Sequence, residues 1–489
     1  MMPVVAVKSN LLVLKQSSIF EKEIFKESIS MLLLFALTAV IVYKMPQIIA
    51  TFFIVIIVIT FFRSKKDYFW LAYFFILICC PGNFFTEAQR ESLYRLPVFS
   101  LGVGFTFTTH EVFMIAALVK ALFSGRKYRY LLAKPLLLIS FYTLFLFLVS
   151  LGIYGTSIGT LAYFLRNFLF YSCLISVPFL IKTDEDTAKF VRLPLPLIFF
   201  TFFTAVYFFI TGSHFVLLFS PGSLREIYMF GHVARFGMFG GEHILVLYCF
   251  IFSLLLSLLN IRHNIYFNIV GALAYISILM TATRVWFVVF TLILMVFLVK
   301  SKRIGKVVGV LFALAVIGYG ISIYSPGSSV KFQATAQRLT SIFSIREEGS
   351  QSYKMLEHKS ENRLPVVLEG IKENPVLGWG FSDKAMAVMD PDVGNFSLIA
   401  QVGLVGFLCF IYFWSSYFAI IAATRRRLSR TDPFKNALSI LPASFTGFLV
   451  AHFTTHQFFG LTLLAYNLFF LAIFIFLSDF FVREALKTR

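Results

Sequence analysis

The stretch from Pro46 to Phe62 reads PQIIATFFIVIIVITFF, an apolar run without a charged side chain, and Arg63, Lys65 and Lys66 follow it closely. At 1.5 Å per residue, a helix of this length comes close to crossing the roughly 30 Å of hydrocarbon in a bilayer. Basic residues directly after such a run are typical of a transmembrane helix that ends at the cytoplasmic face. This stretch therefore indicates the fold class, and the rest of the chain repeats it.

The composition agrees with a membrane location. Hydrophobic residues make up 59% of the 489 residues and charged residues only 14%, which lies outside the range of soluble globular domains. The formal net charge is +19, but the basic residues lie in short loops between apolar runs and not on one soluble module. We therefore expect no nucleic-acid partner.

Comparable apolar runs recur along the whole chain and predict an all-α, polytopic integral membrane protein with about 14 transmembrane helices. The expected spans are 30–43, 46–62, 68–80, 109–123, 131–152, 158–181, 193–211, 240–259, 265–281, 285–299, 305–323, 396–423, 437–453 and 461–481.

Lys and Arg gather in the loops after every second predicted span, for example in 63–66 and 126–134. Cytoplasmic loops carry this excess, so an even number of spans places both termini on the cytoplasmic side. The expected organisation is a cytoplasmic or interfacial segment (1–29), helices 1–11 (30–323), a large outer loop (324–395), helices 12–14 (396–481) and a cytoplasmic tail (482–489).

Four arginines lie where topology alone does not require a charge. Arg166 is in the middle of a predicted span, Arg284 in an outer turn, Arg235 at the outer mouth of the eighth span and Arg363 in the large loop. A guanidinium binds phosphate oxygens bidentately and stays charged, so these side chains could form a diphosphate clamp. The alternatives are a buried ion pair for Arg166 and interfacial anchoring for the others.

The spacings of common metal and nucleotide sites are missing from the sequence. The eight histidines form no H-E-x-x-H pattern, the five cysteines no C-x-x-C pattern, and the chain has neither a P-loop nor a Rossmann glycine pattern. We expect no metal and no cofactor. His358 in the large loop and Glu242 at the head of the eighth span are weaker candidates for a polar role in a site.

Several stretches of sequence, taken in their order, resemble one family. They are Arg166 with its aromatic neighbours, Ala234–Gly240 (ARFGMFG), Met280–Arg284 (MTATR), and the stretch from Arg363 to Gly380, which ends in NPVLGWG and is followed by Gly403-Leu-Val-Gly406. This series is similar to that of the O-antigen ligase and polymerase superfamily, the polytopic glycosyltransferases of bacterial surface polysaccharide assembly.

The resemblance implies a metal-independent membrane glycosyltransferase of the bacterial inner (plasma) membrane with a periplasmic outer loop. The donor would be an undecaprenyl-diphosphate-linked oligosaccharide, and the acceptor a sugar hydroxyl of a lipid-linked repeat unit or of the lipid A core. Membrane lipids and a chain-length regulator would be further partners. Arg166, Arg235, Arg284 and Arg363 would bind the diphosphate, Arg284 would also act in catalysis, and Asp392 would orient or deprotonate the acceptor hydroxyl.

One difference from the family separates its two activities. Ligases of the superfamily carry a histidine about eleven residues before the glycine that corresponds to Gly403, where this chain has Asp392 and, close by, Asn395. The difference favours an O-antigen or exopolysaccharide polymerase, with an O-antigen ligase second. Asp392 could also be a solvated loop carboxylate.

Two other functions stay open from the sequence. A lipid-linked oligosaccharide flippase would suit many spans and a cationic interior, but predicts two similar halves. A structural assembly subunit predicts that Arg166 and Arg284 tolerate replacement.

Overall fold

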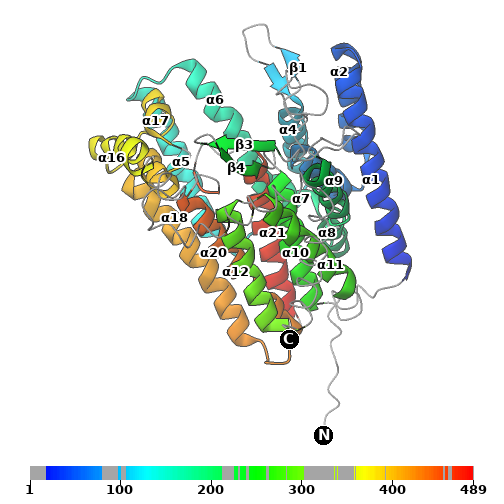
Figure 1. Ribbon diagram of the computed structural model, residues 1–489. Coiled ribbons are helices and arrows are strands. Elements are labelled where there is room, and N and C mark those ends of the chain that lie inside the picture. Colours follow the sequence, from blue (N-terminus) through cyan, green and yellow to red (C-terminus); the bar gives the residue numbers. More distant parts are fainter. Residues whose placement is uncertain are drawn as a thin grey trace.

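The computed structural model describes the backbone of residues 18–79, 97–100, 106–211, 225–229, 232–237, 242–259, 264–281, 283–301, 359–390, 392–454, 458–460 and 465–487, and of the single residues 305, 335, 339 and 357. Within this part of the chain, the protein is a bundle of long helices accompanied by two short β-hairpins (Figure 1). The predicted helical architecture is thus confirmed, and the hairpins are an addition to it.

Most helices of the first half of the chain lie close to the predicted spans. The helical segments of this half are α1 (Ser18–Lys44), α2 (Gln47–Arg63), α3 (Asp67–Cys79), α4 (Thr109–Leu122), α5 (Ala133–Gly152), α6 (Ile158–Phe168), the 3₁₀ segment η2 (Leu169–Ser172), α7 (Cys173–Leu180), α8 (Asp184–Arg192) and α9 (Leu197–Thr211). However, α1 begins at Ser18, twelve residues before the span predicted at 30–43, and α8 lies between two predicted spans.

The second half adds both further bundle helices and the short helices of the large loop. They are α10 (Glu242–Leu259), α11 (Asn264–Met280), α12 (Arg284–Ser301), the π-helical turn η3 (Lys359–Arg363), α16 (Leu364–Glu373), α17 (Asp383–Val388), α18 (Gly394–Arg427), α19 (Pro433–Ala437), α20 (Ile440–Thr454) and α21 (Ala465–Lys487).

Every predicted span except 305–323, which lies outside the described residues, coincides with one of these helices or with a helix pair. Among the described residues, six helical segments are long and apolar enough to cross a bilayer, and four shorter apolar helices accompany them. The fold is therefore that of a membrane-embedded helical protein. The count of about 14 crossings stays a prediction.

The two hairpins lie in the gaps between predicted spans, at 81–108 and 212–239. Strand β1 (Pro97–Ser100) pairs antiparallel with β2 (Thr106–Thr108), and β3 (Arg225–Met229) pairs antiparallel with β4 (His232–Gly237). Helix α4 begins directly after β2, and α10 begins shortly after β4. The hairpins therefore lead into two helices that the bundle buries.

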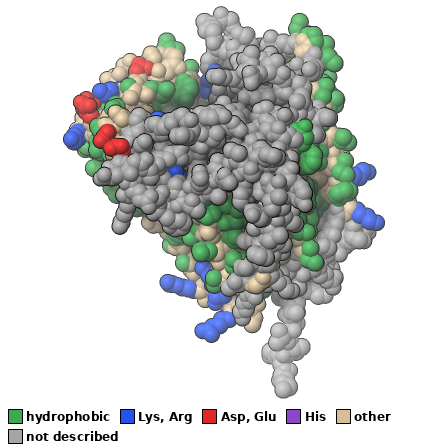
Figure 2. Space-filling view, viewed as in Figure 1, with side chains coloured by type: hydrophobic (Ala, Val, Ile, Leu, Met, Phe, Trp, Pro, Cys, Tyr) green, Lys and Arg blue, Asp and Glu red, His purple; other side chains and the backbone are tan. Residues whose placement is uncertain are grey.

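Three helices form the centre of the bundle. Nearly all side chains of α3 are buried, as are those of α10 from Ile244 to Leu256 and of α21 from Tyr466 to Val482. Peripheral helices such as α2 and α5 instead expose large apolar side chains, including Phe52 and Phe141, and Figure 2 shows hydrophobic side chains along the outer edge of the molecule. Apolar surface of this kind is stable in contact with lipid.

Two of the spans are broken helices. The sixth predicted span divides into α6, η2 and α7, with Pro178 inside α7. Helix α18 contains Gly403 with φ 65° and ψ −178°, a conformation that interrupts its regular hydrogen bonding. Backbone groups that a break releases within a membrane must find hydrogen-bond partners in protein or water. Each break therefore indicates that groups outside the helix supply these partners.

The two ends of the bundle differ in their chemistry. Helix α1 begins and α21 ends at one end, whereas α16 and α17 lie at the other (Figure 1). At the first end, ion pairs join segments that the sequence assigned to the cytoplasmic side: Lys66 with Glu27 (2.6 Å), Lys189 with Glu23 (3.0 Å) and Lys487 with Asp184 (3.1 Å). The predicted inner segments therefore do meet in space.

Candidate functional site

The large loop is held against the break in α18 by main-chain hydrogen bonds. The Trp379 nitrogen donates to the Ala400 carbonyl (2.9 Å), and the Leu404 nitrogen donates to the Pro375 carbonyl (2.9 Å). These bonds satisfy backbone groups that the turn at Gly403 releases from the helix. The loop is thus part of the architecture of α18.

Glycines make this contact possible. A Cβ atom added to Gly378 would lie 2.4 Å from the Gly403 nitrogen, and one added to Gly403 would lie 2.2 Å from the Val376 oxygen. Both residues also have positive φ, at 70° and 65°, which favours glycine. The two glycine-containing stretches singled out in the sequence therefore meet because their backbones touch.

Two tyrosines of the α5 region extend this contact. The Tyr142 hydroxyl donates to the Val402 carbonyl (2.6 Å), and the Tyr154 hydroxyl donates to the Gly378 carbonyl (2.9 Å). The Asn374 side chain donates to the Tyr154 oxygen (2.6 Å). The loop, α5 and α18 consequently form one hydrogen-bonded unit on the α16 side of the bundle.

A further contact ties the loop to α6. Asp383, the first residue of α17, accepts hydrogen bonds from the Ser157 nitrogen (3.0 Å) and hydroxyl (2.8 Å), at the residue just before α6. Hydrogen bonds from Thr160 and Ser157 hold the pKa of the Asp383 carboxyl below its ordinary value. The loop therefore positions the helix that carries Arg166.

Arg363 and Asp392, two of the predicted site residues, form an ion pair. The Arg363 guanidinium donates to the Asp392 carboxylate and also lies 3.3 Å from Asp390 Oδ1. All three side chains are partly exposed. Asp392 is thus an ion-paired carboxylate and not only a solvated one. Arg363 in turn has two anionic neighbours, Asp390 and Asp392.

Asn395 lies close to this ion pair in the chain, in the first turn of α18. Its side-chain oxygen is buried and accepts no hydrogen bond from the residues that the structure describes. A buried amide oxygen without a donor is costly, so this position suits a ligand hydroxyl or a water.

Arg166 forms the buried ion pair that the sequence left open as an alternative. Its Nε lies 2.5 Å from Glu111 Oε1 and its Nη2 lies 3.1 Å from Glu111 Oε2, a bidentate arrangement. The Glu111 side chain is 2% exposed and that of Arg166 is 35% exposed. Glu111 therefore neutralises the arginine while one part of the guanidinium stays accessible.

Arg284 is the first residue of α12 and is partly buried. Two residues further on, the Trp286 ring lies 5.0 Å from the His243 ring at the start of α10, and His243 also contacts Tyr466 at 5.9 Å. Arg284 thus begins the helix whose Trp286 belongs to an aromatic cluster that joins the ends of three helices.

The remaining predicted residues are less completely described. Arg235 lies on β4 opposite Ile227, and Glu242 begins α10, but their side chains are outside the described part. His358 lies outside the described residues altogether. Convergence of Arg166, Arg235 and Arg284 on one pocket accordingly stays a prediction.

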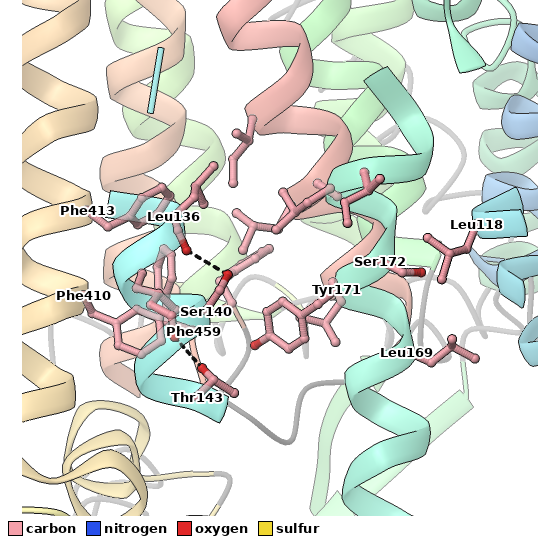
Figure 3. Close-up of a pocket in the computed structure, with 18 residues that line it drawn as sticks. Leu118, Leu136, Ser140, Thr143, Leu169, Tyr171, Ser172, Phe410, Phe413 and Phe459 are labelled. Atoms are coloured by element: carbon pink, nitrogen blue, oxygen red, sulfur yellow. Dashed lines mark hydrogen bonds between the residues drawn. The ribbon is translucent and has the colours of Figure 1, made fainter. Parts of the chain in front are cut away.

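A partly open cavity of about 450 Å³ lies between α5, η2, α7, α18 and α21 (Figure 3). Its walls are mainly apolar and include Leu136, Leu169, Phe410, Phe413 and Leu471. None of the predicted arginines is among the described residues that line it. The segment η2 nevertheless forms one wall, and Leu169 follows Arg166 by three residues.

Most hydroxyl groups that line the cavity donate hydrogen bonds to carbonyl groups of the protein. Ser140 donates to the Leu136 carbonyl (2.8 Å) and Thr143 to the Ile139 carbonyl (2.7 Å), as the dashed lines in Figure 3 show. Tyr171 donates to the carbonyl of Gly460. With these groups satisfied, the cavity offers an apolar surface that suits a hydrocarbon chain.

Sequence reasoning missed Glu111, the partner of Arg166. The signal was present, because a carboxylate at the start of an apolar span needs a partner for the same reason as an arginine within one. Tyr142 and Tyr154 were also missed, and no pattern along the chain distinguishes them from the 19 other tyrosines, given 21 in total. No protein-family model and no curated protein sequence matches this chain.

Proposed function

We propose that this protein is a membrane glycosyltransferase that uses an undecaprenyl-diphosphate-linked oligosaccharide as donor, with polymerisation of a surface polysaccharide favoured over ligation to lipid A core. The observation that carries the proposal is the apolar cavity of about 450 Å³ inside the bundle, one wall of which begins three residues after Arg166. A lipid-linked diphosphate needs this combination of a hydrocarbon site and a nearby cation.

The proposed donor would lie with part of its isoprenoid chain in the cavity and its diphosphate toward Arg166 and Arg284. These guanidinium groups would stabilise the negative charge that grows on the diphosphate as it leaves. Arg166 retains an accessible part of its side chain beside Glu111, which is a requirement for this role.

In the proposed reaction, a hydroxyl oxygen of the acceptor sugar attacks the anomeric carbon of the donor. The new glycosidic bond forms as the bond between that carbon and the diphosphate oxygen breaks, and undecaprenyl diphosphate leaves. The hydroxyl proton passes to a base, for which Asp392 is the proposed group. Its ion pair with Arg363 fixes the position of this carboxylate at the start of α18.

Asn395 supports an acceptor site at the same place. Its buried side-chain oxygen can accept a hydrogen bond from a second sugar hydroxyl. The acceptor would then lie between the α16 side of the loop and the start of α18, with Asp392 and Asn395 on one side.

The test uses purified protein in nanodiscs with undecaprenyl diphosphate oligosaccharide. Growth of longer lipid-linked glycans without an added acceptor lipid is expected for a polymerase, whereas transfer that requires lipid A core would identify a ligase. Translocation of the oligosaccharide without a new glycosidic bond would instead identify a flippase and contradict the proposal.

Variants make the test specific to the proposed residues. Arg284→Ala should abolish turnover with expression intact, and Arg166→Lys should reduce it strongly because lysine keeps the charge but loses the fork. Arg430→Ala, in an exposed loop at the opposite end of the bundle, serves as the matched control and should retain full activity. Undiminished product from Arg284→Ala would remove that residue from the site.

A further inference from the structure

A second cavity lies at the opposite end of the bundle, where α1 begins. It measures about 360 Å³ and is formed by Ile24 and Phe25 of α1, Arg192 at the end of α8, Pro196 just before α9, and residues of α9 and α11. Helix α1 packs against α8 here through Ile24 and Ala188. The cavity is therefore built by three parts of the chain that are distant in sequence.

The cavity crosses the boundary between polar and apolar protein. On one side, α8 carries the ion pairs of Lys189 with Glu23 and Glu185. On the other side, α9 begins the apolar run LIFFTFF at Leu197. Such a boundary is the level at which lipid headgroups lie in a bilayer.

The walls are largely aromatic and partly open to the outside of the bundle. Phe25, Phe199 and Tyr266 all line the cavity and are all exposed. Arg192 carries the only formal charge among the described lining residues, and its guanidinium lies 5.8 Å from the centre of the Phe267 ring. A hydrocarbon chain would fit the aromatic walls, while an anionic group would fit the arginine.

Two more cations lie close to the cavity in the chain. Lys22 and Lys26 are both exposed and, being four residues apart, share one face of α1, in the turn that also carries the lining residues Ile24 and Phe25. Two acidic residues of this stretch are already paired, Glu23 with Lys189 and Glu27 with Lys66, and the Glu21 side chain lies outside the described part. Figure 2 shows basic side chains next to hydrophobic ones at this edge of the molecule.

From this juxtaposition we infer that the cavity between α1, α8, α9 and α11 binds one anionic phospholipid of the surrounding membrane. One acyl chain would occupy the aromatic cavity, and the phosphate would lie at Arg192, with Lys22 and Lys26 adding positive charge on the neighbouring turn of α1. Basic pockets between membrane helices bind anionic headgroups for this electrostatic reason, at a gain of about 1 kcal/mol per cation near the membrane surface. The inference does not depend on the proposed glycosyltransferase activity.

Native mass spectrometry of the full chain in mild detergent tests the inference. Wild-type protein is titrated with phosphatidylglycerol and, separately, with phosphatidylcholine of the same acyl chains. We expect tighter binding of phosphatidylglycerol, and a rise in its apparent Kd of about fivefold in Arg192→Gln. Arg430→Gln, which removes an exposed charge at the same end, should bind as wild type does.

A second variant separates a loss of lipid binding from a loss of folding. Lys22→Gln combined with Lys26→Gln changes only exposed side chains and should raise the apparent Kd by about twenty-fivefold. A cooperative thermal transition equal to that of wild type establishes that each variant is folded. Equal affinity of wild type for the two lipids, or unchanged phosphatidylglycerol binding in the folded double variant, would overturn the inference. Neither measurement involves a glycan, so its result is separate from that of the turnover assay.

Discussion

At the scale of single residues, the ion pair between Arg166 and Glu111 shows how the protein tolerates charge within its helices. An unpaired charge in a membrane helix is costly. The Glu111 side chain is almost completely buried, and its carboxylate forms a bidentate ion pair with Arg166. A phosphate could compete for the accessible part of the same guanidinium. The pair thus both stabilises the bundle and keeps a cation close to the apolar cavity.

Removal of the carboxylate should destabilise the protein. Glu111→Gln leaves Arg166 without its counter-charge, and we expect a loss of about 3 kcal/mol in the free energy of unfolding, seen as a lower Tm in detergent. Glu373→Gln is the control, because its partner Lys384 and Glu373 itself are both exposed and such pairs contribute less than about 1 kcal/mol. Equal Tm values for the two variants would show that the Arg166–Glu111 pair contributes no more to stability than an exposed pair does.

At the scale of elements, the contact between the large loop and the break in α18 is the main organising feature. The loop supplies hydrogen-bond partners to backbone groups around Gly403, as membrane burial requires. It also brings Arg363 into contact with Asp390 and Asp392, which lie between α17 and α18. The loop therefore contributes to the proposed acceptor site and is anchored on α18, on the α5 region and at Ser157 just before α6.

Gly403→Ala should detach this loop. The substitution forces alanine into a conformation open essentially to glycine and puts its Cβ 2.2 Å from the Val376 oxygen, so we expect a cost of at least about 3 kcal/mol. Faster proteolysis between residues 359 and 392 would report the detachment. Gly159→Ala in α6 is the control, because a Cβ at this position has open space around it, and it should change stability by less than about 1 kcal/mol. Proteolysis of Gly403→Ala at the wild-type rate would contradict the packing described above.

The anchor between α17 and α6 should depend on pH. Because hydrogen bonds lower the pKa of folded Asp383 beneath its ordinary value of 3.8, its stabilising effect is present above that value and is lost as the pH falls through the lower folded pKa. We expect Asp383→Asn to lower the Tm at pH 6 and to match wild type at the lowest pH at which wild type still folds. A Tm difference that stays constant from pH 6 to that limit would exclude titration of this carboxyl as the cause.

At the scale of the whole molecule, the bundle places its acidic and basic inner segments together at one end and the large loop at the other (Figure 1). A membrane protein with this distribution of Lys and Arg should insert with the ion-paired end in the cytoplasm. The loop, its ion pair and the start of α18 would then face outward.

Cysteine labelling in intact cells tests the orientation. Lys384→Cys, at an exposed position of α17, should react with a membrane-impermeant maleimide, and Arg430→Cys, at the other end, should react only after the cells are opened. The four native cysteines in the described part of the chain, at positions 79, 173, 249 and 409, are buried, and Cys80 is replaced by serine in both variants to remove its background. The reverse labelling pattern would invert the proposed topology.

Apolar runs along the chain were enough to predict a helical membrane protein and the position of most of its helices, since burial in lipid depends on the composition of each segment taken alone. The sequence also singled out Arg363 and Asp392, but separately. Only the tertiary structure paired these two across 29 residues, joined Arg166 to Glu111 across 55 and brought Gly378 against Gly403. Contacts of this kind depend on how helices pack and break, which no local pattern of residues encodes.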